Sequence, residues 1–292
     1  MGAVTGRHGG SPNGAGQLYV VATPIGNLED ISLRALDSLA RADAIAAEDT
    51  RVTARLLERH HLRARLIAVH EHNERQSAEK IVEELAQGRN VALVTDAGTP
   101  GVADPGALVV AQARAAGFRV VPIPGPNAAV TALSAAGLPD GPFLFAGFLP
   151  PKAAARRKAL EPLRALPYAL VFYEAPHRIV ESVEDLAAVL GTERQIVLAR
   201  ELTKMFEEIH RCRLGDAAAW LKENPDRRRG EFVLVLEAAP ASRSDDNWEP
   251  LLTALLSELP LARAVKLTCA IAGAKKNAVY KRALSLAGAG RG

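Results

Sequence analysis

The chain has 292 residues, of which 48% are hydrophobic and 24% are charged, and its formal net charge is +3. This composition excludes an intrinsically disordered chain and leaves room for two domains of ordinary size. Because only 4% of the residues are aromatic, the core must consist mainly of Ala, Val, Leu and Ile, as is typical of helices packed on sheets.

The first half of the sequence alternates short apolar strands with amphipathic helices. Strands are predicted at residues 18–23, 43–47, 65–69, 91–95 and 119–123. Helices are predicted after a cap at Asp30 or Ser32, around 81–85, and at 107–116. This alternation predicts an α/β fold with a largely parallel, doubly wound sheet.

The pattern changes after about Asp140. Strands at 143–148 and 169–173 flank a basic helix, and 181–190 form a further helix. Three strand candidates then follow with little helix among them, at 195–201, 207–213 and 231–237. This order favours a second α/β domain with a mixed sheet and antiparallel hairpins.

Changes in composition predict the domain boundaries. Residues 1–16 have no apolar signal core, so we expect a disordered leader. The N-terminal α/β domain then covers 17–140, the second domain covers 141–238, and the Pro, Ser and Asp content of 239–248 predicts a linker. Residues 249–292 form a small, basic helical tail, with six basic residues and no acid from Arg263 to Arg282.

Cysteine and histidine usage indicates neither disulfides nor a metal. Cys212 and Cys269 lie far apart without a CxxC partner, which favours a reducing, cytoplasmic location. His70 and His72 have no further ligand cluster spaced to join them, so no metal is predicted. No uncharged stretch is long enough to span a bilayer, so we expect no membrane association.

Two loops rich in glycine and proline follow the fourth and fifth strands. The first, 96–106, contains neither of the two common nucleotide-binding fingerprints, but Gly98 and Gly101 allow backbone groups to approach a ligand closely. The second contains PGPNA, where Asn127 caps a helix whose free amides suit a carboxylate or a polar edge. Ligands of open α/β sheets bind at the carboxyl ends of the strands, so the two loops predict a small-molecule site. For loop 96–106, a tight crossover turn is the structural alternative.

Charged residues follow two other strands, and each group has a structural alternative. Glu48 and Asp49 end the second strand, where they could bind a ligand or form an ion pair within a capped helix start. Arg200, Glu201 and Lys204 form a similar group, for which an Arg–Glu structural pair is the alternative.

A third charged group follows residues 169–173. Glu174, His177 and Arg178 could supply acid–base and phosphate-binding chemistry. In the structural alternative, Pro176 lies in the first turn of a helix and Glu174 interacts favourably with the helix dipole.

Several motifs follow one another between about Leu18 and Glu237. They are VATPIGNLEDIS from Val21, AEDTR from Ala47, HEHNE from His70, TDAGTPGVADPG from Thr95, PGPNAAVTALSAAGLP from Pro124, GFLP from Gly147, FYEAPHRI from Phe172, ARELTKMFEEIHR from Ala199 and GEFVLVLE from Gly230. Together they resemble the tetrapyrrole methylase family and, within it, the branch that methylates small-subunit ribosomal RNA. The tail sequence GAKKNAVYKRAL from Gly273 is also similar to that branch.

The resemblance implies two α/β domains that hold S-adenosylmethionine in the cleft between them, usually in a homodimer. Where tetrapyrrole enzymes typically carry GDP, this chain has GTP from Gly98, so the acid is absent there and Asp96 could replace it. The residues implied to bind the cofactor are Pro24, Asp96, Gly98, Thr99, Pro100, Val102, Ala103, Asn127, Ala128, Phe172 and Tyr173.

The activity implied by the resemblance is methyl transfer to the 2′-hydroxyl of a cytidine ribose in 16S ribosomal RNA of the 30S subunit. A ribose hydroxyl is a poor nucleophile at neutral pH, so a base or a nearby cation should help the aligned displacement. The candidates, in order, are Glu174 and His177, then Glu48 and Asp49, then Glu201 with Lys204. Phosphate contacts are expected from Arg178, Lys204, Lys266, Lys275, Lys276, Lys281 and Arg282.

Two other functions stay open on the sequence alone. One is methylation of a tetrapyrrole or another small molecule, against which the basic tail argues. The other is a cofactor-sensing protein that binds RNA without catalysis.

Overall fold

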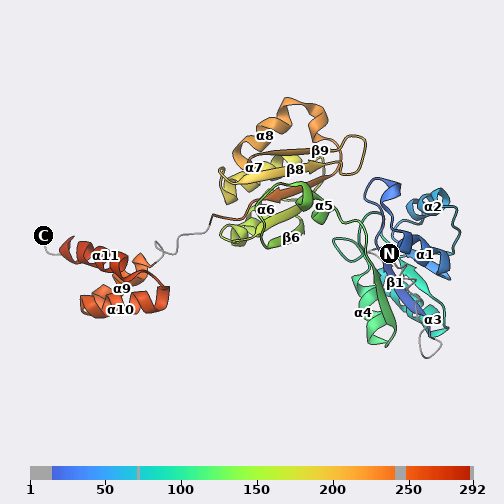
Figure 1. Ribbon diagram of the computed structural model, residues 1–292, viewed down its shortest axis with the longest axis horizontal. Coiled ribbons are helices and arrows are strands. Elements are labelled where there is room, and N and C mark those ends of the chain that lie inside the picture. Colours follow the sequence, from blue (N-terminus) through green and yellow to red (C-terminus); the bar gives the residue numbers. More distant parts are fainter. Residues whose placement is uncertain (1–14, 71–72, 241–247, 290–292) are drawn as a thin grey trace, which may run out of the picture.

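The computed structural model describes residues 15–70, 73–240 and 248–289, and contains two five-stranded sheets followed by three helices (Figure 1). Several predictions concern residues outside these ranges: most of the leader, Glu71 and His72 of the HEHNE motif, and 241–247 of the linker. Within the described ranges, no helix is both long and apolar enough to cross a membrane.

The first sheet is parallel throughout and has the strand order β3-β2-β4-β1-β5. Its strands are β1 (Gln17–Val21), β2 (Ala44–Ala47), β3 (Leu66–Ala68), β4 (Val91–Leu93) and β5 (Arg119–Ile123). The predicted parallel, doubly wound sheet is therefore confirmed, with strand ends one or two residues inside several predicted ones.

Helices cover both faces of this sheet. Successive residues of β1 point to opposite faces, and because most of them are apolar, both faces need a covering layer. Tyr19 and Val21 belong to one apolar cluster with residues of α1 (Leu33–Arg41) and α2 (Thr50–Arg59). Leu18 and Val20 belong to another with α3 (Glu74–Ala86) and α4 (Ala107–Ala115). Ser32 is the residue that caps α1, following a short 3-10 turn, η1 (Leu28–Asp30).

The second sheet is mixed, with the order β6-β7-β10-β8-β9. Strands β6 (Phe143–Phe148) and β7 (Ala169–Glu174) are parallel, while β8 (Gln195–Arg200), β9 (Glu208–Arg213) and β10 (Phe232–Leu236) join by antiparallel pairing. The predicted mixed sheet is confirmed.

One face of the second sheet is covered by α6 (Ala153–Leu160), α7 (Ile179–Leu190) and α8 (Leu214–Glu223), with 3-10 turns at η2 (Glu161–Leu163) and η3 (Pro225–Arg228). Its other face packs on α5 (Ala128–Ala135), which follows β5. The expectation of little helix among the last three strands was wrong, because α8 lies between β9 and β10. Its sequence, LGDAAAWLKE, is rich in strong helix formers.

The tail consists of α9 (Glu249–Glu258), α10 (Leu261–Ala272) and α11 (Lys276–Ala289), which form a separate group in Figure 1. Pro260 caps α10, and Gly273 ends it with φ of +65°. The three helices enclose an apolar core of their own that includes Trp248, Leu252, Val265 and Val279.

Candidate functional site

A cavity of about 300 Å³ lies between loops that follow strands of the first sheet and the face of the second sheet that packs on α5. The side of the first sheet contributes Ile25, Ala97, Gly98, Thr99, Val102, Asp104, Asn127 and Ala128. The side of the second sheet contributes Phe148, Tyr173, Glu174, Ala175, Pro176, Ala199, Leu202, Lys204, Glu231, Phe232 and Val233. Concave, mostly apolar sites with a few polar groups are typical of small-molecule binding.

The glycine-rich loop is fixed to both neighbouring loops. Gly98 and Thr23 exchange two backbone hydrogen bonds of 2.8 and 3.1 Å, and the Thr99 hydroxyl donates to the Pro126 carbonyl at 3.1 Å. Gly98 has φ of +89°, a conformation that side-chain-bearing residues rarely adopt. The loop therefore presents backbone groups to the cavity in a fixed arrangement.

A lateral row of residues from four strands forms the opposite wall. Phe148 lies opposite Tyr173, Tyr173 opposite Val233, and Val233 opposite Ala199. All four line the cavity. Residues paired across neighbouring strands point to the same face, so the pairing of β6, β7, β10 and β8 brings these four together.

The two walls are joined at the start of α5. The Asn127 side chain accepts a hydrogen bond from Val130 N at 3.2 Å, so the predicted cap is confirmed. The next free amide, that of Ala129, donates to the Tyr173 hydroxyl at 3.2 Å. The second sheet thus supplies a partner to the exposed helix start of the first unit.

Four carboxylates gather at the edge of the first sheet, and only one of them lines the cavity. Burial, together with the negative charges of Glu48 and Asp96, raises the pKa of Asp104 to about 6. Glu48 accepts a 2.6 Å hydrogen bond from the Thr95 hydroxyl, and Asp96 accepts one of 2.9 Å from the Asp49 backbone. Asp104 is therefore the acid of this group that a ligand in the cavity would meet.

Asp49 has a structural role at the start of α2. Its side chain accepts from Arg51 N and forms an ion pair of 2.6 Å with the Arg51 guanidinium. Hydrogen bonds from Arg51 lower the pKa of Asp49 to about 2. The ion pair within a capped helix start, which the sequence left as an alternative, is present.

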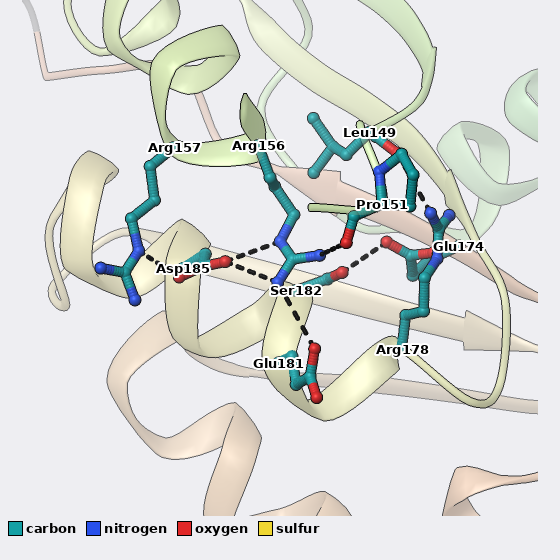
Figure 2. Close-up of polar contacts among 9 residues, drawn as sticks. All are labelled: Leu149, Pro151, Arg156, Arg157, Glu174, Arg178, Glu181, Ser182 and Asp185. Carbon is teal, nitrogen blue, oxygen red and sulfur yellow. Dashed lines mark hydrogen bonds and ion pairs between the residues drawn. The ribbon is translucent and has the colours of Figure 1, made fainter. Parts of the chain in front are cut away.

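Glu174, which lines the cavity, is buried in a polar cluster (Figure 2). Its Oε1 accepts from Arg178 Nη2 at 2.6 Å and from Ala175 N at 2.8 Å, and its Oε2 accepts from the Ser182 hydroxyl at 2.5 Å. Both oxygens are therefore engaged in holding the start of α7 against β7. Pro176, placed in the first helical turn by the structural alternative, precedes α7, and Glu174 forms an ion pair with Arg178, the N-cap residue of that helix.

A second ion pair in Figure 2 ties α6 to α7. Asp185 accepts from the buried Arg156 at 2.6 Å and from Arg157 at 2.5 Å. Arg156 is thus buried in an ion pair, whereas the Arg157 side chain stays more than half exposed.

Lys204 carries the ammonium group of the cavity wall. Its Nζ contacts Glu201 Oε1 at 2.9 Å and Glu231 Oε2 at 2.8 Å. Burial opposes its charge, but the hydrogen bonds to these carboxylates outweigh burial and raise the pKa of Lys204. The Arg–Glu pair proposed as the alternative differs in its partners, because Arg200 pairs with Glu208 and Glu201 with Lys204.

The structure brings together some predicted site residues and separates others. Those that line the cavity are Gly98, Thr99, Val102, Asn127, Ala128, Tyr173, Glu174 and Lys204. Those outside the lining are Pro24, Asp96, Pro100, Ala103, Phe172, Glu48, Asp49, His177 and Arg178. Phe172 points away from the cavity into the apolar cluster under α7, and His177 is exposed.

The lining residues that were not named as site residues from the sequence include Asp104, Phe148, Ala199 and Val233. Asp104 lies within the predicted loop and could have been included. The other three follow only from the order of strands in the second sheet. Within the described ranges, no group of three or more His, Cys, Asp or Glu is arranged to hold a metal ion.

In the tail, four of the predicted phosphate contacts are exposed lysines: Lys266, Lys275, Lys276 and Lys281. Arg282 differs from them, because its guanidinium forms an ion pair with Glu249 across the helical group.

Residues 17–218 match the family model described as Tetrapyrrole (Corrin/Porphyrin) Methylases. The chain belongs to the tetrapyrrole methylase family. Residues 242–287 of this methylase match a second model, described as RsmI C-terminal HTH domain.

The methylase is 52% identical over 284 residues to ribosomal RNA small subunit methyltransferase I of Escherichia coli O157:H7, covering 97% of this chain and 99% of that relative. This similarity shows that it also belongs to the family of that methyltransferase.

Two solved structures share the fold. The methyltransferase CobJ is 24% identical, with a TM-score of 0.60 and coverage of 77% of this chain and 95% of CobJ. Uroporphyrin-III C-methyl transferase from Thermus thermophilus, complexed with S-adenyl homocysteine, is 19% identical, with a TM-score of 0.55 and coverage of 76% and 97%. At these identities the likeness concerns the fold alone.

Proposed function

We propose that this methylase transfers a methyl group from S-adenosylmethionine to the 2′-hydroxyl of a cytidine ribose in 16S ribosomal RNA of the small ribosomal subunit. The observation that carries the proposal is the cavity between the glycine-rich loop and the second sheet, in a chain that is 52% identical to a ribosomal RNA small subunit methyltransferase. The exposed lysines of the tail support an RNA substrate over a tetrapyrrole.

The residues of the cavity fit S-adenosylmethionine, which supplies the methyl group when bound. The apolar wall at Val102, Ala199 and Val233 suits its uncharged parts, and the Asp104 carboxylate suits its positive charge. We assign binding to the predicted residues that line the cavity, namely Gly98, Thr99, Val102, Asn127, Ala128 and Tyr173. Pro24, Asp96, Pro100, Ala103 and Phe172 are assigned to shaping the two walls from behind.

The surroundings of each candidate residue decide which of them could assist the attack of the ribose hydroxyl. Glu48, Asp49 and His177 lie outside the cavity lining. Both oxygens of the buried Glu174 accept hydrogen bonds at the start of α7. Lys204 is a charged group in the cavity wall, and Glu201 and Glu231 fix its position. We assign to Lys204 the stabilisation of negative charge that develops on the ribose oxygen.

We assign RNA and the cofactor to different parts of the chain. Lys266, Lys275, Lys276 and Lys281 would contact RNA phosphates, while the two sheet units, proposed as domains 17–140 and 141–238, hold the cofactor. We propose that the protein acts as a homodimer in the cytoplasm, and light scattering of the purified chain measures the dimer directly.

The test is transfer of a radiolabelled methyl group to small subunits from cells that lack this methylase, with the modified nucleotide mapped. Label on a cytidine ribose oxygen is the expected result. Subunits from cells that contain the methylase serve as the control, because their site is already occupied. Label on a base, or RNA binding without any transfer, would overturn the proposal.

A further inference from the structure

Strand β6 contains an irregularity just before the cavity. Phe145 lies opposite Val171 and Phe148 lies opposite Tyr173, so the register shifts by one residue between Phe145 and Gly147. Gly147 has φ of +66°, a backbone conformation that favours glycine. Such β-bulges redirect side chains and are common beside functional sites.

The consequence of the bulge is that Phe145 and Phe148 share one face of the sheet although they are three residues apart. Both contact Tyr173 edge-on, with ring centroids 4.8 and 5.6 Å away and interplanar angles of 64° and 69°. Edge-to-face contacts of this kind fix the orientation of aromatic rings. Because Tyr173 is itself held by Ala129, Phe148 rests on an anchored ring.

Phe148 nevertheless leaves much of its ring free. It is 54% exposed, whereas Val233 and Ala199 in the same row are 5% and 0% exposed. A residue that both lines the cavity and faces solvent lies at the cavity mouth. An acceptor as large as ribosomal RNA can reach the methyl donor only through that mouth.

We propose that Phe148 stacks on the base of the acceptor nucleotide and thereby positions its ribose at the cavity; this inference rests on the proposed function. Proteins bind unpaired nucleotides by stacking their bases on exposed aromatic side chains. The buried part of the wall, which includes Val233 and Ala199, then contacts the cofactor. Lys204, in the wall contributed by the same sheet, is available to the ribose.

The experiment compares F148A, F148W and F143A in the full chain. Phe143 is a matched control, because it lies on the same strand with 47% exposure but does not line the cavity. Removing a stacking ring should lower kcat/KM for small subunits by about 10-fold or more. We expect F148W to restore transfer, F143A to leave it unchanged, and the cofactor Kd measured by calorimetry to stay within about twofold throughout.

Three results would overturn the inference. Transfer by F148A at the rate of the unmodified chain would exclude the stacking role and leave the proposed function intact. An equal loss of cofactor affinity in F148A would assign Phe148 to the cofactor, and conversion of a dimer to a monomer would assign it to an interface between copies. Absence of transfer by the unmodified chain would instead overturn the proposed function itself.

Discussion

The hydroxyl oxygen of Tyr173 in the second sheet accepts a 3.2 Å hydrogen bond from the backbone N–H of Ala129, which lies just beyond the last strand of the first sheet. Burial raises the pKa of Tyr173, so the hydroxyl stays protonated over the physiological range. One side chain thus joins the two walls of the cavity and supports Phe148 at its mouth.

We expect Y173F to weaken cofactor binding several-fold and to lower the free energy of unfolding by about 1–2 kcal/mol, because the Ala129 amide loses its partner. Calorimetry and denaturant unfolding measure the two effects. Y168F is the control, since Tyr168 is 40% exposed and lies outside the cavity lining. Unchanged cofactor affinity in Y173F would show that this link does not shape the site.

The raised pKa of Asp104 predicts a pH-dependent stability difference. The pKa is 3.8 when unperturbed and about 6 in the folded chain, so the protonated form is favoured by folding. This contribution is complete below about pH 4, is lost as the pH rises to about 6, and is absent above. The Tm of D104N should therefore rise relative to the unmodified chain between pH 4 and 6, by roughly a few degrees. A constant difference across that range would contradict the assignment.

The same group predicts the pH dependence of cofactor binding. A positively charged ligand binds ionised Asp104 better than protonated Asp104, so affinity should increase as the pH rises through about 6. D104N should bind S-adenosylmethionine more weakly at pH 8 and lack this increase. Binding curves from pH 5 to 8 test both statements, and an identical profile for the two proteins would refute them.

The surroundings of Glu174 predict a structural effect of its replacement. E174A leaves Arg178 without its buried partner, which should cost about 3–5 kcal/mol of unfolding free energy. E184A is the matched control, because the exposed pair of Glu184 with Lys222 contributes no more than about 1 kcal/mol. If E174Q instead abolished methyl transfer with no change in Tm, Glu174 would be the base rather than a structural residue.

Removal of the tail should leave cofactor binding intact, because α9, α10 and α11 have their own apolar core. A chain that ends at Asp246 is expected to keep its cofactor affinity and to lose RNA affinity. In the full chain, K276A with K281A should reduce the slope of log affinity against log salt by about 1–2, as expected for two lost phosphate contacts. Loss of cofactor binding on truncation would make the tail a structural element.

R282A provides the contrast to these lysine variants. Because Arg282 pairs with Glu249 in an exposed ion pair, its removal should leave the salt slope nearly unchanged and lower the stability of the helical group by no more than about 1 kcal/mol. Thermal unfolding of the tail and salt titrations of RNA binding distinguish the two effects. A salt slope as strongly reduced as in the lysine pair would place Arg282 on the RNA surface instead.

Much of the fold could be predicted from sequence because the signals are local. Every predicted strand is present, since most are short apolar runs bounded by turn residues; β9, EIHRCR, is the polar exception. Helix α8 was missed because it begins at Leu214, directly after β9 ends at Arg213, so no turn separates the two elements in the sequence. The tail was predicted as helical without internal boundaries, which Pro260 and Gly273 provide at the two ends of α10.

The sequence identified much of the lining on the side of the first sheet, but only Tyr173, Glu174 and Lys204 on the side of the second sheet. Gly98, Thr99 and Asn127 lie in loops whose glycine and proline content indicates a binding site. The other wall is a row across four strands whose order in the sheet differs from their order in the chain. Strict alternation also fails in β6, since the bulge moves Phe148 to the face of Tyr173.

Because the cavity takes its walls from both sheets, its binding free energy is available only when the two are folded and correctly apposed. A bound ligand therefore stabilises each sheet unit only while the other sheet unit is folded as well. Calorimetric unfolding should become more nearly two-state as ligand concentration rises, with the two sheet units melting together.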